Sequence, residues 1–386
     1  MFVALLMFLS SSVWGSVSFI AIAALLKVNR IKYENWNTPL FRIICLISFL
    51  SVINFFVYLI LLGGVPNDNT TAYYPYAIFM FFSYVIAKTI TRAELQLLLL
   101  LFVVDVCVGL IEYQKGVASF WNVDISFDES SELLYFRRIC GINNNSSNFA
   151  EKMLLGFIII YLISPKFKYL YIVIFFIGLI ISFNRSAIIA SIPLLFYFIY
   201  QYIKEGGLFR RVVFLLVICI VVYFLILFLL PLIIEQFFRG NNDTTTAMTS
   251  RDIIWREFLD FFCDNPITGN GSVKMRSSAG QHAHNSYIWV LASNGIIIAL
   301  LYYYYTIRFV NRYNFIPILS ILLTSITQST IYWGLSNADV FLFILILREG
   351  GNLAASNIRN LECPSYEVYL IDYGCGKFNK KVHIME

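Results

Sequence analysis

The sequence predicts an all-α protein, a polytopic bundle of transmembrane helices with a large external loop that contains short amphipathic helices. The chain of 386 residues is 59% hydrophobic and has a mean hydropathy of +0.74. Only 13% of its residues are charged, about half of the share found in soluble domains. Apolar runs of about 17 to 25 residues recur between charged connections, and such lengths fit a hydrocarbon core about 30 Å thick. These observations exclude an ordinary soluble protein.

About eleven spans are predicted, within a range of about ten to twelve. In order they are Val3 to Leu26, Leu40 to Leu62, Tyr74 to Ile90, Leu95 to Tyr113, Met153 to Ile163, Tyr169 to Phe183, Ser186 to Ile203, Val212 to Ile234, Ser286 to Ile307, Phe315 to Thr327 and Ile331 to Leu347. The first run lacks a basic leader and a cleavage signal, so we interpret it as a retained span. Losing one of the last two spans would reverse the side of the tail.

The distribution of basic residues places the N-terminus outside, because short cytoplasmic connections retain Lys and Arg. In this orientation most basic residues face the cytoplasm, namely Lys27, Arg30, Lys32, Arg42, Lys88, Arg92, Lys166, Lys168, Lys204, Arg210, Arg211, Arg308, Arg312 and the basic residues of the tail. The transmembrane domain then covers residues 1–348. A polar cytoplasmic tail, residues 349–386, follows it.

Two long connections, Gln114 to Glu151 and Glu235 to Asn285, are predicted to lie outside. Both are polar and longer than the connections between packed helices, so function is expected there. The second contains a helix, TSRDIIWREFLDFFCDNP, that Thr249 or Ser250 can cap and that Asn265-Pro266 ends. One face of this helix is apolar and is predicted to lie against the membrane interface. That face comprises Ile254, Trp255, Phe258, Phe261 and Phe262.

Several cations fall on the predicted outer side, against the positive-inside trend. They are Arg137, Arg138, Arg185, Arg239, Arg251, Arg256, Lys274 and Arg276. For any single arginine, contact with an anionic lipid head group is the simpler interpretation. Charges near hydrocarbon are costly, however, and arginine binds phosphate through paired donors. The set as a whole therefore predicts a phosphate or diphosphate site.

His282 and His284 are two of the three histidines in the chain, and they end the large loop. No Cys, Asp or Glu cluster completes a metal site beside them, and the spacing of Cys363, Cys375 and His383 in the tail matches no known site. Neighbouring cations would lower the pKa of a histidine, so that it accepts a proton from a hydroxyl near neutral pH. A hydrogen bond that caps the following helix is the alternative role.

Other polar or reactive residues leave alternatives open. The chain has seven cysteines, of which Cys45, Cys107 and Cys219 lie in apolar runs and are interpreted as small hydrophobic residues. Cys140 and Cys263 fall on the predicted outer side, where a disulfide is conceivable. Asp105 interrupts an apolar run. It is interpreted either as a structural ion pair with Arg92 or Lys88, or as part of the site.

No Walker loop, Rossmann glycine pattern or serine elbow occurs in the chain. Nucleotide hydrolysis is therefore not expected to drive a reaction here. An activated substrate must bring its own leaving group, and a lipid diphosphate would do so from within the membrane.

Three segments resemble the membrane glycosyltransferases that include the O-antigen ligases and the O-antigen and capsule polymerases. They are Arg138-Ile139-Cys140-Gly141 with Asn148-Phe149-Ala150, then Phe183-Asn184-Arg185-Ser186, and then Arg251 through Trp255, Asn265-Pro266, Gly269 and Gly271 to His284-Asn285-Ser286 and Gly295. The resemblance covers residues 137 to 300. Asn184 stands where the family has Ser or Thr, and the residues before Gly295 lack the usual acidic one. These departures leave the branch of the family open.

The resemblance implies transfer of a glycan from undecaprenyl diphosphate to a sugar hydroxyl, without a metal or other cofactor. It assigns His284, Arg251 and Arg185 to catalysis. We expect the substrate to be contacted by Arg137, Arg138, Asn148, His282, Asn285 and Arg256. A polymerase in the bacterial inner membrane, with its active site facing the periplasm or exterior, is the preferred function. An O-antigen ligase that acts on lipid A core and a polysaccharide transporter or flippase are the alternatives. Expected partners are the lipid-linked glycan and membrane lipid, with a chain-length regulator left open and no nucleic acid.

Overall fold

The computed structural model describes residues 1–10, 16–31, 36–61, 74–115, 139–143, 145–207, 244–328 and 330–347. In this part of the chain the regular elements are helices and no strand occurs. They are α1 (Phe2–Ser10), α2 (Ser16–Val28), α3 (Pro39–Leu61), the short 3-10 helix η2 (Tyr76–Phe79), α4 (Met80–Thr89), α5 (Arg92–Lys115), α6 (Ser146–Ile163), α7 (Lys168–Ser182), α8 (Arg185–Glu205), α11 (Thr244–Asp264), α12 (Ser286–Arg308), α13 (Phe315–Thr327) and α14 (Asn337–Leu347).

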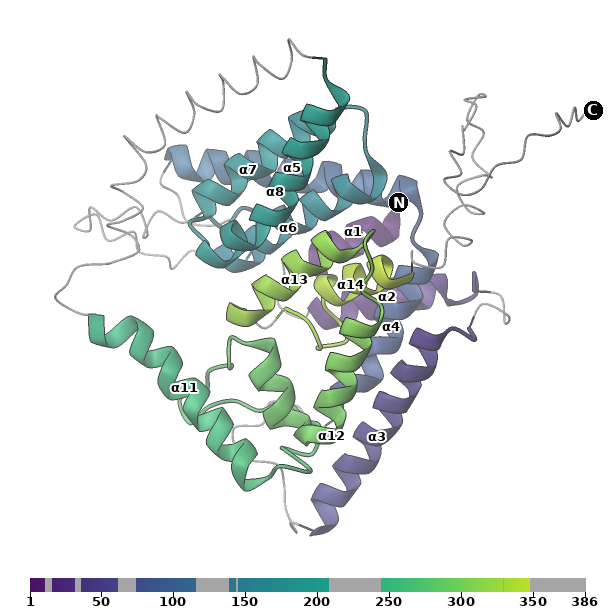
Figure 1. The fold of residues 1–386 in the computed structure, drawn as a ribbon, viewed down its shortest axis with the longest axis vertical. Coiled ribbons are helices and arrows are strands. Elements are labelled where there is room, and N and C mark those ends of the chain that lie inside the picture. Colours follow the sequence, from purple (N-terminus) through teal and green to yellow (C-terminus); the bar gives the residue numbers. More distant parts are fainter. Residues whose placement is uncertain are drawn as a thin grey trace, which may run out of the picture. The chain divides into compact units, whose positions relative to one another are not determined.

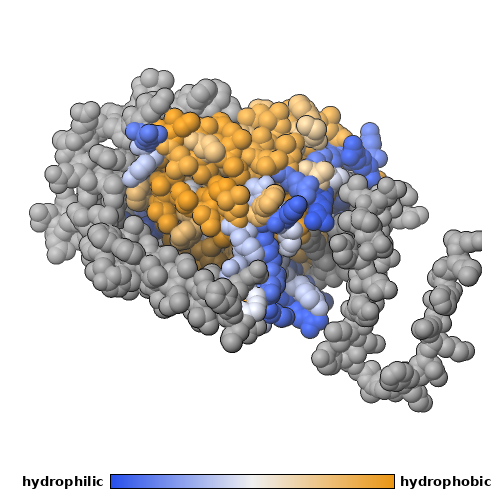
Figure 2. Space-filling view, turned by 90° about the horizontal axis from the view of Figure 1, so that it is seen from above, coloured by the Kyte–Doolittle hydropathy of each residue, from blue (hydrophilic) through white to orange (hydrophobic). Residues whose placement is uncertain are grey.

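Five of these helices are long and apolar enough to cross a membrane, and five other apolar stretches are shorter. The predicted all-α membrane class is confirmed, whereas the count of about eleven spans is not. Hydrophobic residues form a broad continuous area on the face of the molecule that Figure 2 shows. Ile60 is 77% exposed and Phe196 is 67% exposed. Such a surface suits contact with hydrocarbon rather than water.

Helix α6 lies among α5, α7 and α8 (Figure 1) and is the most enclosed of the five long helices. The predicted start of this span at Met153 is wrong, because the helix begins at Ser146. The side chain of Asn145 caps it by accepting a hydrogen bond from the Asn148 N–H at 2.8 Å. Polar residues can occupy the first turns of α6 because these turns face protein rather than lipid.

The first predicted span is wrong, because α1 and α2 are two separate helices that pack against each other. The amino group of Met1 lies 3.9 Å from the Glu94 carboxylate, and Lys27 Nζ lies 2.7 Å from the same carboxylate. The start of α1 and the end of α2 therefore lie at the same end of the bundle. The prediction that the N-terminus and Lys27 lie on opposite sides of the membrane is wrong as well.

Asp105 is fully buried on α5, and its partner is Lys152 on α6, at 3.1 Å. The predicted pairing with Arg92 or Lys88 is wrong. Arg92 begins α5 and lies thirteen residues before Asp105, about 20 Å along a helix axis, and it donates to the Ile163 carbonyl instead. Asp105 also accepts a hydrogen bond from the Ile142 N–H at 2.7 Å. The ion pair therefore fixes a segment that was predicted to be part of an external loop.

The segment 139–143 returns to the bundle before α6 begins. Glu112 near the end of α5 accepts hydrogen bonds from the N–H groups of Cys140 and Gly141, at 2.9 and 2.8 Å. Gly141 has a φ of 59°, and a Cβ at this position would meet the Asp105 carboxylate at 2.3 Å. The predicted external loop, Gln114 to Glu151, therefore ends in a buried turn.

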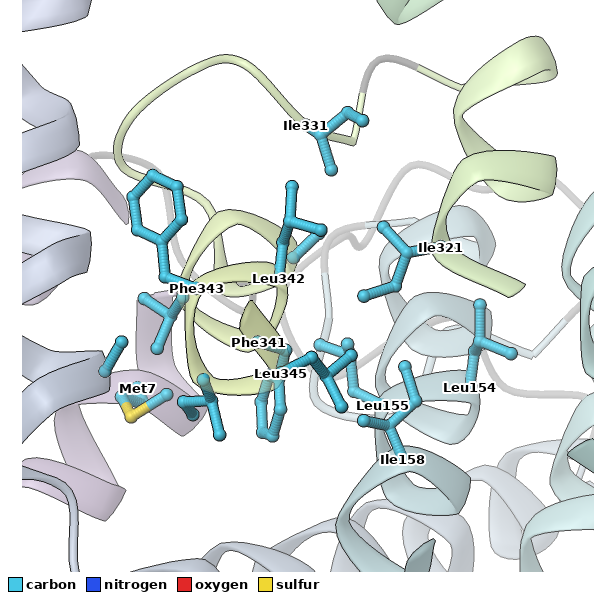
Figure 3. Packing of buried hydrophobic residues seen from close by; sticks show 14 of the residues in the cluster. Met7, Leu154, Leu155, Ile158, Ile321, Ile331, Phe341, Leu342, Phe343 and Leu345 are labelled. Carbon is cyan, nitrogen blue, oxygen red and sulfur yellow. The ribbon is translucent and has the colours of Figure 1, made fainter. Parts of the chain in front are cut away.

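The apolar core shown in Figure 3 joins α1, α6, α13 and α14 through residues such as Met7, Leu155, Ile321 and Phe341. Helix α14 begins at Asn337, so the predicted helical span from Ile331 starts too early. The Asp339 carboxylate accepts hydrogen bonds from the N–H groups of residues 332, 333 and 334, which hold the chain before α14 in a non-helical loop. The predicted span Val212 to Ile234 and the tail, residues 349–386, lie outside the described residues.

Candidate active site

The candidate site is built on a break in α12. Gly295 has a φ of 72° inside this helix, which interrupts the helical hydrogen bonds. The loop that follows α11 supplies new partners, since the N–H groups of Asn270 and Ser272 donate to the carbonyls of Ala292 and Ser293 at 2.9 and 2.7 Å. The Ile296 N–H donates to the Pro266 carbonyl at 2.8 Å. The Asn-Pro-x-x-Gly-x-Gly motif therefore completes the broken helix.

Helix α3 anchors the same loop. Asn54 is buried on α3, and its side-chain amide donates to the Thr268 carbonyl at 2.8 Å and to Ser272 Oγ at 2.9 Å. Gly271 packs directly on Tyr58, where a Cβ would come within 2.9 Å of that side chain. The loop that precedes the histidines is thus fixed to two helices.

Helix α11 carries Arg251 to this loop. The helix extends from Thr244 to Asp264, so the predicted caps Thr249 and Ser250 lie within it rather than at its start. Its predicted apolar face is partly buried inside the protein, since Ile254 is 6% exposed and Phe258 is fully buried. The helix packs on α12 instead of resting on the membrane interface alone. The predicted end before Asn265-Pro266 is confirmed.

Arg251 and His284 are brought together across this contact. Trp255, one turn after Arg251, donates from Nε1 to the Ala283 carbonyl at 2.7 Å. Burial, and then the positive charge of Arg251, lower the pKa of His284 below its ordinary value of 6.5. His284 has a φ of 49°, a left-handed conformation that is unfavourable for a residue with a side chain. The imidazole is therefore neutral near pH 7 and lies within the electrostatic influence of the Arg251 guanidinium.

Asn285 follows as the cap of α12. Its side-chain oxygen accepts hydrogen bonds from the N–H groups of Tyr287 and Ile288 at 2.9 and 3.1 Å. This engagement explains why a helix begins directly after His284. The role in substrate binding that was predicted for Asn285 stays a prediction.

His282 lies in a second cationic group, with Lys274 and Arg276. A tight turn joins the two arms of the loop, since Ser277 N–H donates to the Gln281 carbonyl at 2.8 Å. Burial, and then the charges of Lys274, Arg276 and His284, lower the pKa of His282 to about 3. Burial, and then Arg276, lower the pKa of Lys274 to about 8. His282 is therefore neutral at pH 7 as well.

Asn148 lines a small polar cavity, and Arg185 lies next in sequence to Asn184, another of its lining residues. Arg185 begins α8, and its neighbour Asn184 caps that helix by accepting from the Ala187 N–H at 3.1 Å. The cavity measures about 60 Å³ and is lined by Ser147, Asn148, Glu151, Asn184, Ala187, Thr324, Gln328 and Thr330. Ser286, two residues after His284, donates to the Gln328 carbonyl at 3.2 Å and accepts from the Thr330 N–H at 3.0 Å. This contact connects the cavity wall to the start of α12.

Other predicted residues are not brought to this site. Arg137, Arg138 and Arg239 lie outside the described residues. Arg256 is exposed on α11, five residues after Arg251 and thus rotated by about 140° around the helix axis. Its predicted contact with substrate stays a prediction.

Metal and disulfide chemistry find no support in the described ranges. No group of three or more His, Cys, Asp or Glu residues there could hold a metal. Cys140 is buried and Cys263 is exposed, and no disulfide joins them. The disulfide considered for this pair is therefore not formed. Cys219, Cys363, Cys375 and His383 lie outside the described residues.

Two residues near the site were not identified from the sequence. Trp333 was assigned to a span, yet it lies in the loop before α14 and contacts His282 and Lys274. Glu151 was taken as the end of an external loop, yet it lines the cavity on α6. For Trp333, the only signal in the sequence was the glycine that follows it in the segment Tyr332-Trp333-Gly334, which indicates a turn rather than a helix.

These features define a helical membrane protein with a neutral histidine and arginines gathered at one end of its bundle. Residues 170–303 match the family described as O-antigen ligase. This match supports the resemblance to the O-antigen ligase and polymerase family. The matched stretch includes Arg185, Arg251 and His284. Comparison with curated proteins gave no match.

Proposed function

We propose that this protein is a polymerase that extends a surface polysaccharide. It transfers the growing glycan from undecaprenyl diphosphate to a sugar hydroxyl of the next lipid-linked repeat unit. The family match supports glycan transfer, and the pairing of Arg251 with a neutral His284 is the observation that carries the mechanism. The protein would act in the bacterial inner membrane with this site facing the exterior.

The reaction forms one glycosidic bond and breaks the bond between the anomeric carbon and the oxygen of the diphosphate. The acceptor hydroxyl oxygen attacks the anomeric carbon, and the electron pair of the broken carbon–oxygen bond departs with the diphosphate. His284 takes the hydroxyl proton, which its lowered pKa permits near neutral pH. Arg251 and Arg185 hold the diphosphate and offset the charge that develops on it.

The strained conformation of His284 supports a catalytic role. Its left-handed φ of 49° is maintained by the Asn285 cap on one side and by the contact of Trp255 with Ala283 on the other. Backbone strain of this kind persists where the surrounding structure enforces it, often at functional sites. The imidazole position is therefore set before substrate binds.

Replacement of His284 by alanine tests the proposal. In cells, His284→Ala is expected to abolish long polymer and to leave single lipid-linked repeat units, because the acceptor hydroxyl loses its base. The glycan pattern is read by gel electrophoresis of extracted lipid-linked material. Normal polymer length in cells that make normal amounts of the variant would refute the catalytic role.

The ligase is the second candidate, because the matching family is described as O-antigen ligase. Its chemistry would use the same residues, with lipid A core as the acceptor. Deletion of the gene separates the two functions. Loss of a polymerase leaves one-unit glycans on the carrier, whereas loss of a ligase leaves long polymer on the carrier.

A further inference from the structure

A second group of cations lies beside the candidate active site, on the other side of the segment 282–284. Lys274 Nζ lies 4.2 Å from the centroid of the Trp333 ring. The opposite face of that ring is stacked on Trp289, with centroids 4.7 Å apart and planes at 7°. The ring attracts the ammonium through its π electrons and holds Lys274 in place without neutralising its charge.

Donors in this group lack partners within the described part of the chain. Arg276 Nε, His282 Nδ1 and Trp333 Nε1 are all buried there without a hydrogen bond. No salt bridge engages Lys274 or Arg276 among the same residues. Buried polar groups are normally hydrogen-bonded, and leaving several unpaired at one place is costly. A ligand with oxygen acceptors and a negative charge would satisfy them together.

The two cationic groups act on different histidines, and the two histidines also interact with each other. The charge that lowers the pKa of His284 is that of Arg251, whereas Lys274 and Arg276 act on His282. The Ala283 carbonyl between the histidines is held by Trp255 of α11, while the His282 ring contacts Trp333 with centroids 5.7 Å apart. The segment 282–284 therefore presents one histidine to each group.

The loop that carries Trp333 is rigidly held. Asp339 binds three successive N–H groups of this loop, and Ser83 Oγ on α4 donates to the Gly334 carbonyl at 2.7 Å. Tyr332, just before Trp333, has a φ of 73°. The indole is therefore positioned by two helices before any ligand arrives.

We propose that Lys274, Arg276 and His282 form a second oxyanion site, which binds a carboxylate or phosphate substituent carried by the glycan. This inference rests on the proposed function, in which Arg251 and Arg185 hold the diphosphate of the carrier lipid. A glycan bound along the segment 282–284 would have its leaving group at Arg251 and an acidic sugar at Lys274. The substrate class is thus an acidic, rather than a neutral, repeat unit.

Binding to the full-length protein in lipid nanodiscs tests this site without relying on catalysis. The probes are a disaccharide that contains glucuronate, the same disaccharide with glucose instead, and inorganic pyrophosphate. The variants are Lys274→Met, which keeps the length of the side chain on Trp333, and Arg276→Gln. The exposed cations at the opposite end of the bundle provide matched controls, Lys166→Gln and Arg312→Gln.

The acidic disaccharide is expected to bind the unaltered protein at least about tenfold more tightly than the neutral one, as a charge-assisted hydrogen-bonded contact implies. Each site variant should reduce that preference about tenfold, and the controls should leave it unchanged. Because Lys274 loses its proton as pH rises through about 8, the preference should also weaken above that pH. Lys274→Arg, which keeps the charge, should retain it.

Three outcomes would overturn the proposal. Equal binding of both disaccharides would exclude recognition of an acidic sugar. Loss of pyrophosphate binding in Lys274→Met, with the acidic preference absent, would assign the cations to the leaving group. The assay is repeated with and without phosphatidylglycerol in the nanodiscs. If the acidic preference appeared only without this anionic lipid, the lipid head groups would be competing for the cations and would be their natural ligands.

Failure of the proposed function is distinguishable from failure of this site. His284→Ala removes the base but leaves Lys274 and Arg276 in place, so it should still prefer the acidic disaccharide. If His284→Ala kept both the acidic preference and full transfer activity, the catalytic role of His284 would be refuted and the oxyanion site would still be supported. If transfer required His284 but the unaltered protein bound the acidic and neutral disaccharides equally, only the oxyanion site would be refuted.

Discussion

At the scale of single residues, environment rather than residue type decides what each ionisable group does. His284 and His282 are two residues apart, yet Arg251 acts on the first and Lys274 with Arg276 on the second. Both imidazoles are neutral near pH 7, because burial and neighbouring cations disfavour the protonated ring. Neutrality is the property that a base for a sugar hydroxyl requires.

The pH dependence of glycan transfer follows from the lowered pKa of His284. The rate should stay constant from neutral pH down past 6.5 and fall only when pH drops through the lowered pKa, where the imidazole takes up a proton. Arg251→Gln removes a positive charge, so the pKa should rise and the acid limb should move to higher pH. A pH–rate profile of purified protein measures this, with Arg256→Gln as the control on the same helix. An unmoved acid limb in Arg251→Gln would contradict the pairing.

The buried Asp105–Lys152 ion pair has a structural role, because it joins α5 to α6. Both side chains are fully buried, and Lys152 Nζ also lies 3.9 Å from the Phe8 ring centroid of α1. A buried pair of this kind costs desolvation, so it is retained where both partners have further contacts. Here Asp105 also holds the turn before α6.

Lys152→Met should destabilise the protein by about 3–5 kcal/mol, because it leaves the Asp105 charge buried without its partner. The comparison is Lys168→Met, which breaks a partly exposed pair with Glu205 at 2.8 Å and should cost at most about 1 kcal/mol. Unfolding in mixed micelles measures both. The double variant Asp105→Asn with Lys152→Met should recover part of the loss. Equal effects of the two lysine variants would show that the buried pair is not structural.

At the scale of elements, the break in α12 gives a structural role to glycines that the sequence shares with the family. These glycines need no part in the chemical reaction. Gly269 and Gly295 lie where the loop after α11 meets the interrupted helix, each with a positive φ. The loop replaces the missing helical partners, so the motif sets the position from which Asn285 starts the helix. Catalytic and binding residues then lie on a rigid support.

Gly295→Ala should abolish folding or severely reduce it. A Cβ at this position would lie 2.0 Å from the Ile267 carbonyl oxygen, and the φ of 72° is itself unfavourable for alanine. Gly207→Ala is the matched control, because no atom of the described residues lies within 4 Å of a Cβ there. The yield of monodisperse protein after detergent extraction measures the difference. Normal yield of Gly295→Ala would refute the close contact.

At the scale of the whole bundle, the ends of the helices differ in charge and in the polar groups they carry. Lys27, Glu94, Arg92 and Lys168 make their contacts at one end, where α2 ends and α5 and α7 begin. The histidine site and the small cavity lie where α6, α8 and α12 begin. By the positive-inside rule the first end is expected to face the cytoplasm, and the proposed chemistry would then lie outside. Charges buried inside the bundle form ion pairs with each other, as in Lys27 with Glu94 and Lys152 with Asp105. A transporter would use charges inside the bundle to bind its substrate, so this pairing favours an enzyme.

Cysteine labelling tests this arrangement, including the hairpin of α1 and α2. In a cysteine-free background, Phe2→Cys and Ser164→Cys should react from the cytoplasmic side and Ser278→Cys from the outside. All three residues are exposed. The hairpin requires position 2 to share the side of position 164, whereas a single first span would place it with position 278. Labelling of positions 2 and 278 from one side would therefore contradict the hairpin.

The sequence by itself determined the membrane class, most helix locations and the set of residues worth testing. It could do so because apolar length is a local property and because charged residues make up only 13% of the chain and histidines number three. Only the tertiary structure decided the partner of Asp105, the hairpin at the start of the chain, the start of α6 and the position of Trp333. Each of these depends on whether a polar group faces protein or lipid, and that is set by packing between segments far apart in the sequence.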